Sequence, residues 1–146
     1  MKYLKKFNES NSDKVEEIKK FCEENLAYLI DAGFSLKYLD YSNDDDRDLF
    51  NIDYQSIGLN VFLVRNSTFR WNEVVDDFVP FLQILDDKYG LIRLKPTSSR
   101  DKYSKKCSIM FHDNFTYRYT LDDLINDRTD GISDKKLEDI EFSVKI

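Results

Sequence analysis

The spacing of apolar residues changes at Gly33 from a helical repeat to a strand repeat. Before this glycine, apolar residues from Val15 to Ile30 recur every three or four positions, which predicts one face of a helix. After it, residues 34–38 alternate between apolar and polar, which predicts a strand with one buried face. Gly33 is expected to end the helix in the left-handed conformation. A chain with both repeats must pack helices against a sheet.

The first helix is expected to begin at Asp13, because Asp13 and Glu16 have the spacing of a capping box. Residues 1–12 are polar and mixed in charge, so we predict a flexible N-terminal arm there. No composition break, linker or repeat divides the rest of the chain. Residues 13–146 are therefore predicted to form one domain.

The middle of the chain predicts a buried strand and a second helix. Residues 57–65 carry apolar side chains on both faces, so this strand should lie centrally in the sheet. Residues 71–89 return to helical spacing with Asn72 as the expected N-cap and Gly90 as the end. Pro80 is expected to kink or break this helix near Asp77.

The last third of the chain predicts mainly strands. Residues 91–95 read as a strand, and residues 107–112 and 115–120 read as a hairpin with a two-residue turn, one long bent strand being the alternative. A capping box at Thr120 predicts a short helix, and residues 140–146 alternate as a closing strand. We therefore expect an α+β fold, with two main helices on one face of a mixed, mostly antiparallel sheet of five or six strands.

The composition describes an acidic protein with enough apolar residues for a core. Its 146 residues are 41% hydrophobic and 14% aromatic, which excludes the disordered class, and the net charge is -6. No stretch reaches the length of a membrane span, and the N-terminus lacks the apolar run of a signal peptide, so we expect a cytoplasmic protein. Cys22 and Cys107 have no zinc-site spacing and are expected as buried thiols, a disulfide being the alternative.

The sequence contains no assembled catalytic motif. His112 is the only histidine and lies in a predicted strand without a nucleophile motif around it, so we expect a sheet-face histidine and no enzyme activity. The turn around Gly131 resembles a calcium loop, but the alignment places Arg128 and Leu137 at ligand positions. We therefore expect neither a metal nor another cofactor.

An acidic segment between the first two predicted strands is the first candidate binding site. Residues 40–53 have a net charge of -5, and aromatic residues accompany the carboxylates. Such a segment is either a solvated connector or a surface that meets a basic protein partner. The candidate partner-binding residues are Tyr41, Asp44, Asp45, Asp46, Asp48 and Phe50.

A basic segment is the second candidate site. Residues 88–106 have a net charge of +6 in a chain whose total is -6, which favours either an anionic ligand or a loop that balances acidic neighbours. Leu91 is expected to share its strand face with the basic residues, and Ile92 to point into the core. A nucleotide-like small molecule is the alternative partner, and nucleic acid fits the acidic chain less well. The candidate anion-binding residues are Arg93, Lys95, Arg100, Lys102, Lys105 and Lys106.

The opening of the chain resembles a group of phage proteins. Residues 1–10 read Met-Lys-Tyr-Leu-Lys-Lys-Phe-Asn-Glu-Ser, and the predicted helix ends at residues 28–34 with Tyr-Leu-Ile-Asp-Ala-Gly-Phe. This first quarter resembles the start of small uncharacterised accessory proteins of large tailed bacteriophages of AT-rich hosts. The resemblance implies a non-enzymatic interaction protein that binds and modulates a host protein in the host cytoplasm, including proteins of antiviral defence.

Overall fold

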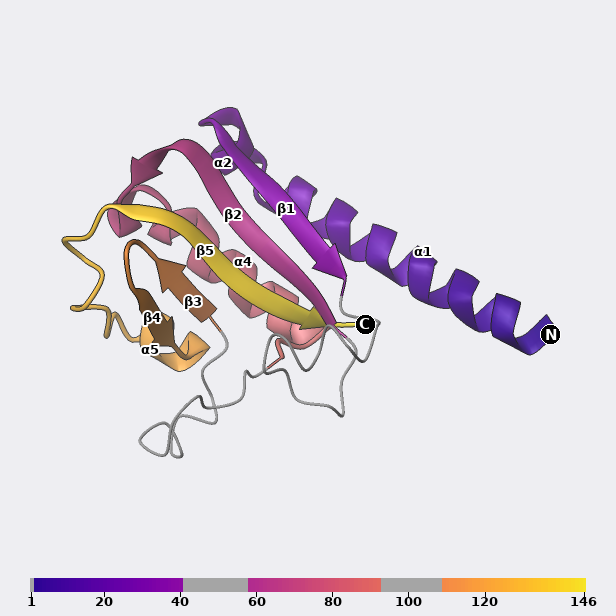
Figure 1. Cartoon of the computed structure of the whole chain (residues 1–146). Helices are drawn as coiled ribbons and strands as arrows, with labels where there is room; N and C mark the ends of the chain where they lie inside the picture. The colour runs from indigo at the N-terminus through magenta and orange to yellow at the C-terminus, as the bar shows by residue number, and fades with distance from the viewer. Residues whose placement is uncertain (1, 41–57, 93–108) are drawn as a thin grey trace.

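A computed structural model describes residues 2–40, 58–92 and 109–146 of the chain (Figure 1). Five strands form one sheet in the order β1-β2-β5-β3-β4, and every described strand pair is antiparallel. The strands are β1 (Phe34–Asp40), β2 (Gly58–Phe69), β3 (Ile109–His112), β4 (Thr116–Tyr119) and β5 (Leu137–Lys145). The predicted α+β class is confirmed, and β2 has a neighbour on both sides, as predicted for a central strand.

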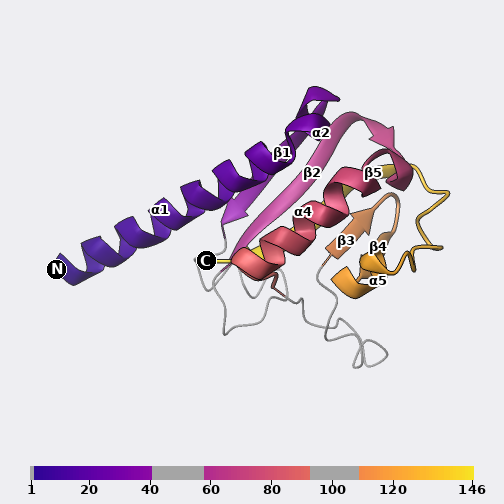
Figure 2. The same cartoon turned by 180° about the vertical axis from the view of Figure 1, so that it is seen from behind.

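Helices cover one face of this sheet, as predicted (Figure 2). The helical elements are α1 (Lys2–Asn25), α2 (Ala27–Asp31), the 3₁₀ turn η1 (Trp71–Glu73), α4 (Val75–Lys88) and α5 (Leu121–Ile125). The N-terminal part of α1 extends past the sheet, and α5 lies beside the β3–β4 hairpin (Figure 1). Among the described residues, no helix combines the length and apolar character needed to cross a membrane.

The hydrophobic core lies between the sheet and the helices. Alternate residues of β5, including Ile140 and Phe142, are buried on this side because successive side chains of a strand point to opposite faces. Helix α1 contributes Ile18, and α4 contributes Phe78, whose ring centroid lies 5.7 Å from that of Phe142. Aromatic side chains therefore join α4 to the central strand β5.

The first helix begins earlier than the sequence pattern predicted. Helix α1 begins at Lys2, so the predicted start at Asp13 is wrong and Asp13 lies inside the helix. Residues 2–12 contain no glycine or proline that would end a helix, which explains why the helix continues through them. Gly90 has φ +94° and follows α4, which confirms the end predicted for the second helix. The first predicted helix is divided instead: α1 ends at Asn25, and Gly33, with φ +97°, follows the separate helix α2.

The second helix differs from its prediction at both Asn72 and Pro80. Asn72 lies inside η1 instead of capping the helix, and the break occurs at Val74, between η1 and α4. Helix α4 continues through Pro80, so of the kink or break predicted near Asp77, the break is wrong. Because Pro80 lies in the second turn, the carbonyl that loses its partner belongs to exposed Asp76, where water can bind it.

The predicted hairpin is confirmed, with a longer turn. Strands β3 and β4 pair from Ile109↔Tyr119 to His112↔Thr116, and three residues separate them instead of two. Asp113 Oδ1 accepts a hydrogen bond from Phe115 N at 2.7 Å, which stabilises the turn without the positive φ values expected of a two-residue turn.

The strand predicted at residues 91–95 is described only at its start. Leu91 forms an antiparallel bridge with Val144, and Ile92 N donates to Ser143 O at 2.8 Å. Both residues are buried, and Leu91 belongs to the core between sheet and helices. The prediction that Leu91 lies on a polar face is therefore wrong, because its pairing with β5 directs its side chain to the core.

Candidate functional site

The candidate binding residues of the acidic and the basic segment lie outside the described residues. The acidic set from Tyr41 to Phe50 and the basic set from Arg93 to Lys106 both fall there, as does Cys107. Of the basic segment, Lys88 is described, and its Nζ atom lies 5.0 Å from the centroid of the Phe21 ring. This cation–π contact places Lys88 on the helix side of the protein.

The structure fixes the points where both segments join the sheet. Asp40, before the acidic segment, pairs with Leu59, and Leu59 pairs with Val144 of β5. Leu91, which precedes the segment 93–108, also bridges Val144, and Ile109, which follows that segment, pairs with Phe142. The acidic and basic segments are therefore attached at the same end of the sheet.

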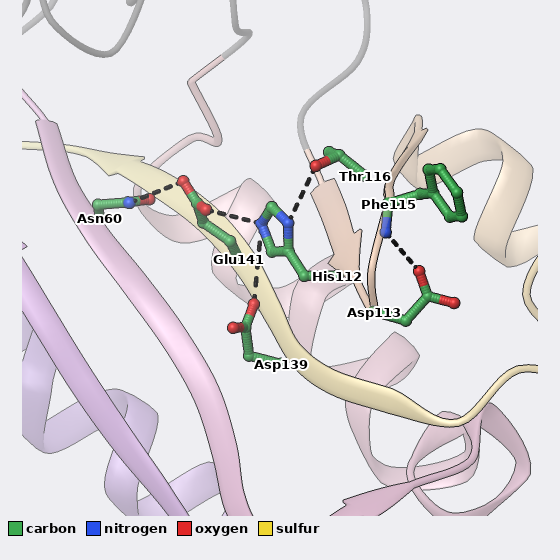
Figure 3. A network of polar contacts seen from close by, with 7 residues as sticks. All are labelled: Asn60, His112, Asp113, Phe115, Thr116, Asp139 and Glu141. Atoms are coloured by element: carbon green, nitrogen blue, oxygen red, sulfur yellow. Dashed lines mark hydrogen bonds and ion pairs between the residues drawn. The ribbon is translucent and has the colours of Figure 1, made fainter.

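A polar network crosses the sheet face that is turned away from the helices (Figure 3). We call this face the outer face. The network contains Asn60, His112, Thr116, Asp139, Glu141 and Ser143. These residues come from β2, β3, β4 and β5, which are four neighbouring strands, so the network links most of the width of the sheet.

His112 is the centre of the network, because both its ring nitrogens have partners. Its Nε2 atom lies 3.0 Å from Glu141 Oε1, and its Nδ1 atom lies 3.2 Å from Thr116 Oγ1. Since a carboxylate only accepts hydrogen bonds, Nε2 carries a proton and donates to Glu141. The hydroxyl of Thr116 accepts from Nδ1–H when the ring is charged and donates to Nδ1 when it is neutral.

Glu141 connects this histidine to a buried amide. Its Oε2 atom accepts from Asn60 Nδ2 at 2.9 Å, and Asn60 Oδ1 accepts from Ser143 Oγ at 2.8 Å. Asn60 and Ser143 are fully or almost fully buried. Buried polar groups must be hydrogen-bonded to be tolerated, so Glu141 stabilises two partners at once.

Asp139 adds a second carboxylate beside the imidazole. Its Oδ1 atom lies 3.7 Å from His112 Nε2, and this buried oxygen has no hydrogen-bond donor within the described part of the chain. Burial, partly offset by the charge of His112, raises the pKa of Asp139 above its usual range. A protonated His112 therefore compensates a carboxylate that is otherwise poorly solvated.

The carboxylates also change the titration of His112. The hydrogen bond to Glu141 raises the pKa of His112 above 6.5, burial opposes this rise, and the charges of Asp139, Glu141 and Glu138 add to it. The imidazole is consequently held in its charged form to a higher pH than a free histidine.

The order hydroxyl, imidazole, carboxylate is also found in the triads of hydrolases. Here, however, Thr116 and His112 are direct partners in the hairpin register, and His112 and Asp139 are direct partners across β3 and β5. The contacts thus follow from strand pairing.

Cys22 has a free, buried thiol, and burial raises its pKa to about 12, which leaves it a poor nucleophile.

Metal binding has no support in the part of the chain that the structure describes. There, no three or more His, Cys, Asp or Glu side chains are grouped so that they could hold a metal ion.

Sequence analysis identified His112 as a sheet-face residue but missed its partners. The alternation of residues 140–146 contains a signal, because Asp139, Glu141 and Ser143 occupy the positions between core residues and so share the other face. The pairing of β5 with β2 and β3 brings Asn60 and His112 to that face, and this pairing has no local signal in the sequence.

Comparisons with known proteins give no relative. No protein-family model matches the chain, and no match was found among the curated proteins or the solved structures.

Proposed function

We propose that this chain is a non-enzymatic interaction protein that binds and modulates another protein. One observation supports the proposal: both ring nitrogens of the only histidine, His112, are already in contact with side chains of the protein, Thr116 and Glu141. The group best suited to acid–base catalysis near neutral pH is thus part of a cross-strand link. The resemblance of the N-terminal quarter to phage accessory proteins supports a host protein as the partner, including one of antiviral defence.

The acidic segment 40–53 is the proposed contact with this partner. Its net charge of -5 would attract a basic surface, and Tyr41 and Phe50 would supply apolar anchors. The segment leaves the sheet after Asp40, and β2 begins at Gly58, next to the position paired with Asp40. Both flanks are thus fixed on adjacent strands, which supports a binding segment presented by a rigid scaffold.

Capture from a host lysate tests this proposal. We expect the wild-type protein to retain a specific host protein, and the triple variant Asp44→Ser, Asp45→Ser, Asp46→Ser to lose most of it, because three charges at the contact are removed. The amount of captured protein is measured by quantitative mass spectrometry at low and at high salt. Capture by the wild type is expected to fall with salt, since screening weakens charge attraction.

A matched variant separates this contact from net charge. Asp31→Ser, Asp76→Ser, Asp87→Ser removes the same number of carboxylates from exposed helix positions and should leave capture unchanged. Equal capture by wild type and the 44–46 variant would exclude the acidic segment as the contact. Turnover of a nucleotide or an ester at an enzyme-like rate by the purified protein would contradict the non-enzymatic class.

A second candidate function is the binding of an anionic small molecule by the basic segment. The net charge of +6 in residues 88–106 favours it. The attachment of this segment at the end of the sheet where the acidic segment also joins favours instead a loop that balances acidic neighbours. Thermal melting with nucleotides and oligonucleotides distinguishes the candidates. A ligand at 100 times its dissociation constant adds about 2.7 kcal/mol to the free energy of unfolding. A melting temperature that no anion changes at low salt would count against this candidate.

A further inference from the structure

The β3–β4 hairpin is a short edge of the sheet. Each of its strands has four residues, and within the described sheet it is joined to the other strands only where β3 pairs with β5, from Ile109↔Phe142 to His112↔Asp139. An isolated two-stranded hairpin is marginal in water, so its stability depends on these contacts. Edge elements with few contacts belong to the parts of a protein that open first.

Two faces of the hairpin hold it in place by different means. On the core face, the ring of Phe111 contacts Trp71 and Tyr119 at centroid distances of 5.1 and 5.4 Å. On the outer face, His112 contacts two carboxylates of β5 through Nε2 and Thr116 of β4 through Nδ1. The core contacts do not depend on pH, whereas the contacts of the imidazole do.

We propose that the β3–β4 hairpin is held to β5 by a proton-dependent link centred on His112, so that the hairpin opens more readily once the imidazole is neutral. In the charged state, Nε2–H and Nδ1–H donate to Glu141 and Thr116, and the positive charge compensates Asp139. In the neutral state the hydrogen bonds persist, because Thr116 reverses its role. The half-buried carboxylate of Asp139, whose Oδ1 atom is buried, then loses its counter-charge.

The charged and titratable groups around His112 come mainly from β5. Strand β5 supplies Asp139 and Glu141 on the same face, and Glu138 next to them in sequence. Strand β4 supplies the uncharged Thr116 and, two positions further on the outer face, Arg118. Beyond β5, β2 supplies only the uncharged amide of Asn60 to the network. Among the residues that the structure describes, the carboxylates therefore outweigh the cations around the ring.

The sign of the pH dependence follows from linkage. In the opened hairpin, His112 has its ordinary pKa of about 6.5, and in the closed hairpin the hydrogen bond to Glu141 raises the pKa above this value. The stabilisation of the closed hairpin is thus fully present below about pH 6.5 and is lost as the pH rises through the closed-state pKa. The loss is tenfold in the opening equilibrium for each unit by which the pKa is raised.

Amide hydrogen exchange on the full chain tests this link at about pH 5.5 and about pH 8.5, on either side of the free histidine pKa. Exchange rates are normalised to those of an unstructured chain at the same pH. We expect protection of the amides of residues 109–119 to fall between the two values, by the tenfold-per-unit factor, while protection within β1 and β2 changes less. His112→Gln, which keeps a donor but does not titrate, should abolish the difference.

A second variant controls for surface charge in general. Lys37→Gln removes an exposed charge from β1, away from His112, and should keep the wild-type pH dependence. The proposal is overturned if wild-type hairpin protection is equal at both pH values, if β1 and β2 lose as much protection as the hairpin, or if His112→Gln retains the pH dependence. Loss of the pH dependence in Lys37→Gln would also overturn it.

Discussion

Phe142→Ala is expected to lower the free energy of unfolding by about 3 to 5 kcal/mol, the usual cost of truncating a buried phenylalanine. Phe142 lies in the central strand β5, and its ring centroid lies 5.7 Å from that of Phe78 and 5.8 Å from that of Phe81, both in α4. Removing the ring leaves a cavity between sheet and helix. A loss of this size is a large part of the stability of a typical domain.

Urea denaturation followed by far-ultraviolet circular dichroism measures this loss. Phe115→Ala serves as the control, because the side chain of Phe115 is 72% exposed at the hairpin turn. This exposed substitution should change the free energy of unfolding by less than about 0.5 kcal/mol. Similar losses in both variants would show that the aromatic cluster around Phe142 is not the core of the fold.

Glu141→Ala is expected to cost about 1 to 3 kcal/mol, because it removes the acceptor of a buried donor. Asn60 Nδ2 loses its partner inside the protein, and His112 Nε2 loses its nearest carboxylate. The cost should be larger below about pH 6.5 than well above the raised pKa of His112, since the stabilisation by the charged imidazole is present only at the lower pH.

The matched control for this variant lies three residues earlier on the same strand. Glu138→Ala removes the same charge, but Glu138 is exposed and outside the hydrogen-bonded network. Urea denaturation of both variants, below about pH 6.5 and well above the raised pKa of His112, should show a larger loss in the free energy of unfolding for Glu141→Ala at each pH. Equal losses would mean that Glu141 acts only through its charge and that its bond to Asn60 contributes little.

Much of the fold could be predicted because its signals are local. The change of period at Gly33 and the alternation in β5 determine which elements form and which side is buried. The capping box at Thr120 is confirmed as well, with Asp123 N donating to Thr120 Oγ1 at 3.0 Å. Such patterns involve residues only a few positions apart, so a single sequence contains them.

The errors arose where local patterns competed or where long-range pairing decides. Asp13 has the spacing of an N-cap, but nothing before it interrupts the helix, so α1 continues back to Lys2. Pro80 lies in the second turn of α4, and the helix continues through it with the exposed carbonyl of Asp76 left to bind water. The order of the sheet, with the last strand β5 between β2 and β3, depends on contacts between distant residues.

The candidate site, too, was predictable from local patterns only in part, because it also depends on long-range strand pairing. The alternation of β5 places Asp139 and Glu141 on one face, but only the pairing of β3 with β5 brings His112 between them. The charged segments 40–53 and 88–106 stood out in the sequence because charge runs are visible without a fold. Their role in binding remains a prediction, which the capture and melting experiments test.

Titration of the only histidine by proton NMR tests most directly the central claim that His112 is a charged link between strands. One imidazole Cε1–H resonance is expected, so its assignment needs no variant. We expect an inflection above about pH 6.5 in the wild type and a lower one in Glu141→Ala, because the hydrogen bond to Glu141 is the main cause of the raised pKa of His112. An inflection at or below pH 6.5 in the wild type would contradict the account, since it would mean that burial outweighs the carboxylates.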